Sequence, residues 1–155
     1  TVVVQRAGEV IPQVLGPIAN LRTGNEKVFR MPDDCPVCGS IVKRPKGEAA
    51  HRCPNINCRS QIHESLKHFA SRNAMEIDGL GESLSKSLLE AGLVKDIADC
   101  YYLTKDQLMT IEKIGEKSAA NILNAINRSK ERSMARALYS LGIFHVGMET
   151  SEILA

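Results

Sequence analysis

Four cysteines give this sequence its clearest chemical signature. They stand as C-x2-C-x14-C-x4-C within the segments CPVCG and CPNINC: Cys35, Cys38, Cys53 and Cys58. Zinc binds four thiolates in a tetrahedron at about 2.3 Å, and two tight turns joined by a hairpin supply that geometry without a large core. The spacing therefore predicts a structural zinc site that leaves no position for a catalytic water.

The alternative for these cysteines is a pair of disulfides. A fifth cysteine, Cys100, would then be unpaired, and no secretory signal is evident, so a reducing compartment and a metal site are favoured. His51 and His63 are competing ligands, but with four thiolates in place we expect both to face solvent or phosphate. Cys100 has neither a base nor a second cysteine beside it in sequence. We expect a small buried residue there and not a nucleophile.

The composition favours several small modules over one large core. Only 4% of the 155 residues are aromatic, and none is Trp. No apolar run approaches the length of about 20 residues that a membrane-spanning helix needs, so we expect no membrane partner. The chain begins within an apparent strand, which indicates a piece of a longer protein.

The net charge of +2 conceals a segregation of charges along the chain. Residues 43–72 carry a net charge of +5, residues 76–112 carry −5, and residues 113–136 carry +4. A solvated charged face is the ordinary explanation of each run, and contact with nucleic acid is the alternative.

The elements that would position these groups can be read from the apolar pattern. Residues 1–22 read as two extended pieces around a Gly turn, the end of a β domain, and residues 23–34 read as a linker. The zinc module follows at residues 35–59. A helix is expected at 60–72, where one apolar face holds Ile62, Leu66, Phe69 and Ala70.

From residue 75 onward one theme repeats three times: a helix, a short hairpin containing glycine, and a second helix. The first hairpin contains Gly79-Leu80-Gly81, and the second contains Lys113-Ile114-Gly115 after a helix that Thr104 and Gln107 begin as a capping box. The third runs from Gly142 to Gly147, after a helix that contains Leu138 and Leu141, and its second helix is incomplete.

These hairpins are suited to binding phosphate. In a Gly-hydrophobic-Gly turn the middle residue packs inward, and the glycines expose backbone amides beside a helix N-terminus. One such turn is weak evidence, but three in the same register make DNA binding the better hypothesis. Because amides contact phosphates and not base edges, binding should be indifferent to sequence and strongly dependent on salt.

The order of the modules resembles that of bacterial NAD-dependent DNA ligases. The stretch from Arg6 to Val14 is similar to the end of that family's OB domain, and the four cysteines are similar to its zinc finger. The segments HFASRNAMEIDGLGE, GEKSAANIL and LYSLGIFHVG resemble its helix-hairpin-helix domain. The resemblance implies a multi-domain, mainly α chain: an OB end at 1–22, a linker, a zinc finger at 35–59 and three hairpins, the last incomplete, at 60–155.

The resemblance also implies a function. The parent enzyme would seal nicks in duplex DNA through lysyl-AMP and DNA-adenylate intermediates, with NAD and magnesium as cofactors, as a monomer in the bacterial cytoplasm and nucleoid. The nucleophile motif Lys-x-Asp-Gly does not occur here, because Glu76 precedes Asp78-Gly79 where Lys is needed. No catalytic or NAD-binding residue is therefore expected in this chain. The adenylation domain would lie upstream and a BRCT domain downstream.

What this chain would do is hold DNA. The residues implied in DNA contact are Arg6, Gly79, Gly81, Lys113, Gly115, Lys117 and Gly147. Lys113 departs from the pattern because it stands where a first hairpin glycine is expected. Two other hypotheses remain: a non-enzymatic zinc and hairpin adaptor for a repair nuclease or helicase, and a protein-interaction fragment whose hairpins only pack helices.

Overall fold

The computed structural model describes residues 1–8 and 10–155, which form two compact units, Thr1–Pro32 and Asp33–Ala155. Glu9, within the stretch that resembles an OB domain, lies outside the described residues. Each unit is described by itself. None of the helices in the described part of the chain has the length and hydropathy that a membrane span requires.

The first unit is a two-stranded antiparallel sheet. Strands β1 (Val2–Ala7) and β2 (Ile11–Pro17) pair with a register shift between Val3 and Val4, and a short 3-10 helix, η1, covers Ala19–Leu21. The two expected extended pieces are therefore confirmed. Both strands are edges, which is where proline is tolerated, and Pro12 pairs with Arg6. An isolated two-stranded sheet buries too little surface to be stable by itself.

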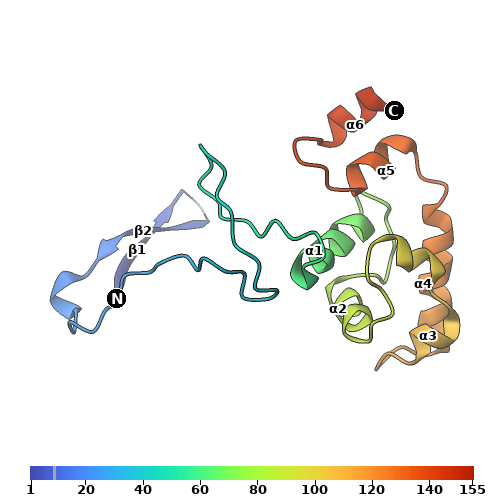
Figure 1. The fold of residues 1–155 in the computed structure, drawn as a ribbon, viewed down its shortest axis with the longest axis horizontal. Helices are drawn as coiled ribbons and strands as arrows, with labels where there is room; N and C mark the ends of the chain where they lie inside the picture. Colours follow the sequence, from blue (N-terminus) through green and yellow to red (C-terminus); the bar gives the residue numbers. More distant parts are fainter. Residues whose placement is uncertain (9) are drawn as a thin grey trace. The chain divides into compact units, whose positions relative to one another are not determined.

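The second unit begins with the cysteine segment, which contains turns and two isolated bridges, Asp34 with Ile41 and Lys43 with Arg52. Helices then follow one another to the end of the described chain (Figure 1). They are α1 (Arg59–Ala70), α2 (Glu82–Glu90), η2 (Ala98–Tyr102), α3 (Lys105–Met109), α4 (Glu116–Ser129), α5 (Met134–Ser140) and α6 (Met148–Leu154).

The hydrophobic core of this unit lies among α1, α2, η2, α3 and α4. Its fully buried leucines come from four different segments: Leu66, Leu80, Leu88 and Leu108. The expected inward face of α1 is confirmed for Leu66, Phe69 and Ala70, while Ile62 is half-buried.

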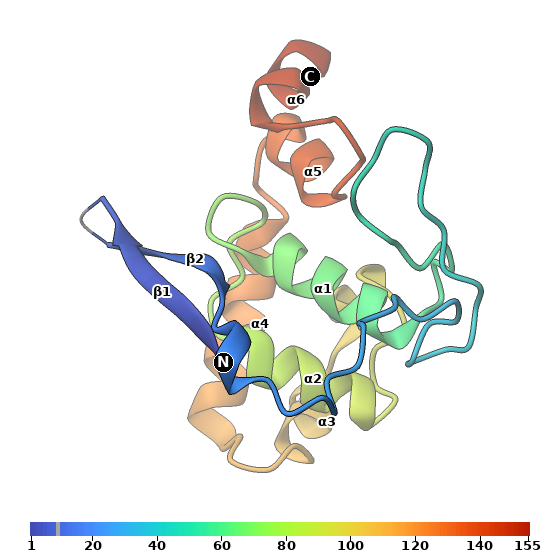
Figure 2. The ribbon, with the colours of Figure 1, turned by 90° about the vertical axis from the view of Figure 1, so that its left-hand side faces the viewer.

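Helices α5 and α6 lie at one end of this unit and α3 lies at the opposite end (Figure 2). The buried residues of α5 and α6 are small and polar, Ser140 and Ser151. The side chain of Leu141 is 51% exposed. Leu141 is the C-cap residue of α5.

Candidate metal centre and nucleic-acid interface

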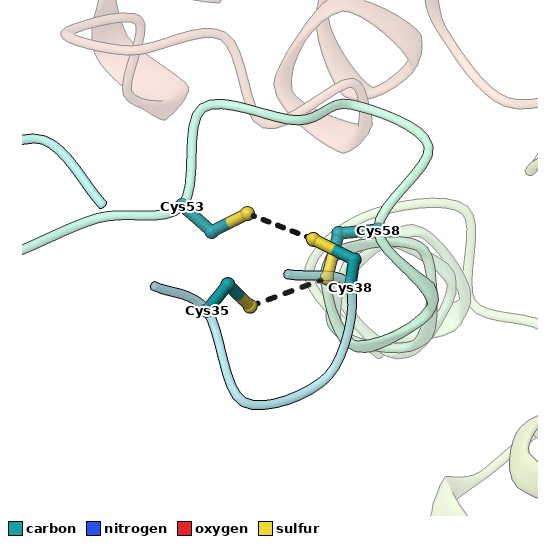
Figure 3. A group of neighbouring side chains, drawn as sticks. All are labelled: Cys35, Cys38, Cys53 and Cys58. Atoms are coloured by element: carbon teal, nitrogen blue, oxygen red, sulfur yellow. Dashed lines mark hydrogen bonds between the residues drawn. The ribbon is translucent and has the colours of Figure 1, made fainter. Parts of the chain in front are cut away.

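The four cysteines converge on one point (Figure 3). Their sulfur atoms all lie within 4.8 Å of one another. The Sγ atoms of Cys35 and Cys58 are 3.9 Å apart, and those of Cys38 and Cys53 are 3.5 Å apart. A tetrahedron of thiolates at about 2.3 Å from zinc has edges of about 3.8 Å. The cluster therefore has the size that a zinc ion requires, and the thiols are free of disulfide bonds.

Backbone hydrogen bonds fold the cysteine segment around this point. The amide of Gly39 donates to the carbonyl of Cys35, and the amide of Cys35 donates to the carbonyl of Ser40, both at 2.8 Å. These two bonds close the first turn. The last cysteine, Cys58, is fully buried and is the N-cap residue of α1. The cluster is thus joined directly to the helix that carries Leu66 into the core.

The two histidines near the cysteines do not join the cluster. His51 is exposed, and Nε2 of His63 lies 3.2 Å from the carbonyl oxygen of Glu82, at the start of α2. The expectation that neither is a ligand agrees with this geometry. His63 nevertheless has a protein partner, so it does not simply face solvent.

The thiols of the cluster differ in acidity. Hydrogen bonding to Ser40 lowers the pKa of Cys38 to about 6. A backbone hydrogen bond from Asn55 lowers the pKa of Cys53, but burial and the neighbouring thiols Cys38 and Cys35 outweigh it and raise that pKa to about 12. Because zinc binds thiolates and not thiols, metal binding at this cluster should release protons.

Cys100 is a buried thiol, as expected. Its Sγ donates a hydrogen bond to the carbonyl of Ile97 at 2.9 Å. Burial, with further contributions from Asp96 and Asp99, raises the pKa of this thiol to about 12. The thiolate that a nucleophile needs is therefore disfavoured at neutral pH.

The three hairpins share one backbone conformation. Each contains three successive residues of which the first is left-handed: Gly79 has a φ of 91°, Lys113 a φ of 69° and His145 a φ of 65°. The middle residue points inward, fully for Leu80 and partly for the other two. Lys113 thus adopts the glycine-like conformation that its place in the pattern implied. His145 was not singled out from the sequence, although its position two residues before Gly147 marks it.

The third residue of each hairpin is a glycine that begins a helix. Gly81, Gly115 and Gly147 are the N-caps of α2, α4 and α6, and none of the three has a side chain to cap the helix. The other helices of these hairpins differ, because Thr104 caps α3 in the expected capping box and Ser133 caps α5. Without a capping oxygen, the first amides of α2, α4 and α6 remain available to another acceptor.

Steric surroundings separate these glycines into two kinds. A Cβ on Gly79 would lie 2.8 Å from Cγ1 of Ile122, and its positive φ also favours glycine, so the fold itself requires Gly79. A Cβ on Gly81, Gly115 or Gly147 would meet no atom within 4 Å among the described residues, and their φ values lie between −81° and −92°. Neither packing nor backbone strain explains these three glycines.

A small buried residue stands four positions after each of these N-caps: Ser85, Ala119 and Ser151. The hydroxyl of Ser85 donates to the carbonyl of Gly81 at 2.5 Å, and that of Ser151 donates to the carbonyl of Gly147 at 2.9 Å. Ala119 fills the same place in the second hairpin without a hydroxyl. A large side chain at any of these positions would separate the helix from its hairpin partner.

An open groove of about 990 Å³ runs between the first and second hairpins. Asp78 and Gly79 line one side of it, and Ile114 with the polar face of α4 lines the other. Lys113 lies in the second hairpin and Lys117 in the first turn of α4, and both residues are exposed. The remaining residue expected to contact DNA, Arg6, is exposed on β1 in the first unit.

Comparisons with known families agree with this division of the second unit. Residues 34–59 match the family described as the NAD-dependent DNA ligase C4 zinc finger domain. Residues 71–128 match a SAM-like helix-hairpin-helix tandem. The fold and the cysteine cluster therefore define a zinc-finger and helix-hairpin-helix protein, and zinc is the metal that fits the cluster.

Curated relatives named DNA ligase match the chain along its length. The relative from Rubrobacter xylanophilus is 54% identical over 155 residues, and that from Desulfitobacterium hafniense is 52% identical over 154 residues, which are 100% and 99% of this chain. The chain spans 23% of the length of each relative. It is homologous to one segment of these DNA ligases, and within this chain that stretch contains the zinc-finger match and the helix-hairpin-helix match.

Proposed function

We propose that this chain is the DNA-gripping part of an NAD-dependent DNA ligase that seals nicks in duplex DNA through enzyme-AMP and DNA-adenylate intermediates. The observation that carries the proposal is the repeated hairpin backbone. In each hairpin a residue with a positive φ stands two positions before a glycine, and this glycine begins a helix that has no capping side chain. Homology to DNA ligases along the whole chain supports it and disfavours a non-enzymatic adaptor. The chain itself performs no covalent step.

The hairpins would bind phosphates by their backbone amides. Helix N-termini attract anions, and Gly81, Gly115 and Gly147 leave space where a Cβ would otherwise stand between the amides and a phosphate. Lys113 and Lys117 would add positive charge at the second hairpin, and Arg6 would contact DNA from the first unit. Gly79 acts by allowing the turn to pack on Ile122.

The zinc finger would hold the modules in a fixed relation and take no part in catalysis. Cys35, Cys38, Cys53 and Cys58 are the proposed ligands, because their sulfur atoms make the one cluster of metal-binding groups found among the described residues. Four thiolates complete the coordination of zinc, so no position remains for a reacting water.

The remaining parts of the proposal concern the parent enzyme. Residues 1–22 would end an OB domain, 23–34 would form a linker, 35–59 the finger and 60–155 the hairpin domain. NAD and magnesium would bind to other parts of the enzyme, which would continue into adenylation and BRCT domains. It would act as a monomer on nicked duplex DNA in the bacterial cytoplasm and nucleoid.

Binding of the zinc-loaded chain to nicked duplex, intact duplex and single strand across a salt series tests the proposal. We expect duplex to be preferred, with log K falling by about 0.9 per decade of salt for each phosphate neutralised. Gly81→Val and Gly115→Val should weaken binding without unfolding the chain, because both positions are extended and open. Gly16→Val, at another open glycine outside the hairpins, is the matched control.

Comparison of Lys113→Ala with the glycine variants separates the contribution of side-chain charge to DNA binding from that of the backbone amides. Removal of one phosphate-contacting cation should reduce the salt slope by about 1, whereas the glycine variants should lower affinity with little change in slope. Wild-type affinity in both folded glycine variants would show that the hairpins are scaffold and would refute the proposal.

A further inference from the structure

Arg52 of the cysteine segment reaches the turn of the third hairpin. Its guanidinium carbon lies 5.0 Å from the centre of the Phe144 ring. Phe144 lies between α5 and α6, directly before the left-handed His145. A guanidinium over an aromatic face is attracted by the ring quadrupole. This contact joins two segments that are 92 residues apart in the sequence.

The backbone of Arg52 is fixed by the fold of the cysteine segment. Its amide donates to the carbonyl of Lys43 and its carbonyl accepts from the amide of Lys43, both at 2.8 Å. Its Nε donates to a carboxylate oxygen of Glu48 at 3.3 Å. Because Arg52 directly precedes Cys53, the folding of this segment around its thiolates also sets the position of the guanidinium.

Few apolar contacts hold the receiving turn from inside, although the amide of Val146 donates to the carbonyl of Ile143 at 2.9 Å. Phe144 is 57% exposed, and its ring centre lies 4.0 Å from that of His145. The buried residues of the flanking helices are Ser140 and Ser151, which supply little apolar contact. Contacts from neighbouring segments therefore add to the backbone bond that the turn makes within itself.

We propose that Arg52 is a positioning residue that couples the metal centre to the third hairpin through Phe144. When the finger is folded around zinc, the guanidinium would hold the Phe144-His145 turn and with it the first amides of α6. Loss of zinc would release this turn while the first two hairpins keep their core. The effect on DNA binding rests on the proposed function, whereas the effect on the turn does not.

Hydrogen exchange of the zinc-loaded chain tests the coupling directly. In Arg52→Ala, we expect faster exchange at the amides of residues 143–149, unchanged exchange at 79–84 and 115–120, and a zinc content equal to the wild type. Zinc chelation should give the same pattern at 143–149. Lys46→Ala, which removes a positive charge from the same basic segment, is the control and should leave residues 143–149 unchanged.

A second variant removes the ring far from the thiolates. Phe144→Leu keeps an apolar side chain but removes the ring face, so it should also speed exchange at residues 143–149 with zinc retained. Arg52→Ala should then have no further effect in the Phe144→Leu background. Each single variant should weaken duplex binding about two- to fivefold, and the double variant no more than that.

Two results would overturn the coupling: unchanged exchange at residues 143–149 in Phe144→Leu, or full additivity of the Arg52 and Phe144 substitutions. The expected exchange pattern in a chain that binds no duplex would support the coupling and refute the proposed function. The two failures can therefore be told apart.

Discussion

The first two hairpins and the third share a backbone conformation, but different interactions hold them in place. The helices of the first two enclose Leu80, Leu88, Leu108 and Ile122, all of which are almost fully buried. In α5 and α6 the buried residues are two serines. Hydrophobic burial is therefore concentrated in the first two hairpins.

Directional polar contacts hold the third hairpin. Nε of Arg136 donates to the carbonyl of Ala74 at 2.6 Å, and Nη2 of the same side chain donates to the carbonyl of Arg72. Nε2 of His68 lies 2.9 Å from the carbonyl of Tyr139, and the two rings meet edge to face. Each such bond contributes roughly 1 kcal/mol, so a few substitutions could release this hairpin without unfolding the core.

Loss of a cysteine ligand should have the largest effect, because it unfolds the finger, frees the start of α1 and releases the third hairpin. Structural zinc contributes on the order of 10 kcal/mol of apparent binding free energy in small fingers. In Cys58→Ser we expect loss of zinc, disorder of the finger, and faster hydrogen exchange in α1 as well as in the third hairpin. Cys100→Ser, buried outside the cluster, should keep its zinc. One zinc per chain in Cys58→Ser would contradict the assignment.

A matched pair of leucines tests the difference in burial. Leu88 is fully buried in α2, whereas Leu138 is half-buried in α5. Leu88→Ala should reduce the free energy of unfolding by about 2–5 kcal/mol, and Leu138→Ala by less than about 1 kcal/mol. Urea denaturation measures both. Equal losses would mean that the two regions are stabilised in the same way.

Removal of Arg136 should affect only the third hairpin. Its guanidinium also lies 3.6 Å from a carboxylate oxygen of Glu76, which Arg132 contacts at 2.6 Å. Arg136→Ala should cost about 1–3 kcal/mol and speed exchange in α5 and α6. Arg128→Ala, in the exposed last turn of α4, is the control. Faster exchange throughout α1 to α4 in Arg136→Ala would show that the regions are not separate.

Removal of the ion pair between Lys105 of α3 and Glu116 of α4 should have the smallest effect. The side chain of Lys105 bonds to Glu116 and lowers the pKa of that carboxyl group. A lowered pKa in the folded state stabilises the protein above the ordinary pKa, and this contribution is lost as pH falls through the lowered value. The stability difference between wild type and Glu116→Gln should therefore shrink from about pH 6 to pH 3. A difference constant with pH, or one equal to that of Glu112→Gln, would exclude this ion pair.

Local patterns in the sequence predicted much of this structure. The cysteine spacing gave the cluster, the apolar period gave the inward face of α1, and Thr104 with Gln107 gave the capping box of α3. Each of these signals lies within a few residues or follows a fixed period, so physical rules for single elements are sufficient to find it.

What the sequence did not reveal depends on contacts between distant segments. Arg136 and the carbonyl that it binds are 62 residues apart, and a backbone carbonyl has no sequence signature. The left-handed conformation of His145 follows from the turn between α5 and α6 in which it lies. For the same reason the open space around Gly81 could not be distinguished from the close packing around Gly79.

The buried serine of the first hairpin orients a peptide unit. The hydroxyl and the amide of Ser85 both donate to the carbonyl of Gly81, at 2.5 and 3.0 Å. In a trans peptide the carbonyl and the following N–H point in opposite directions. Two bonds that draw this carbonyl into the helix therefore direct the amide of Glu82 outward before any ligand arrives. An incoming anion meets a donor that is already aligned, and less conformational entropy is lost on binding.

The three hairpins therefore differ in how firmly the peptide at the start of the helix is oriented. Ser151 secures the carbonyl of Gly147 with the same pair of bonds, whereas at Ala119 only the amide bonds to the carbonyl of Gly115. The hairpin with the less constrained peptide is also the one with a lysine, Lys113, in the left-handed position. Preorganisation in two hairpins and charge in the other would be two physical routes to the same contact.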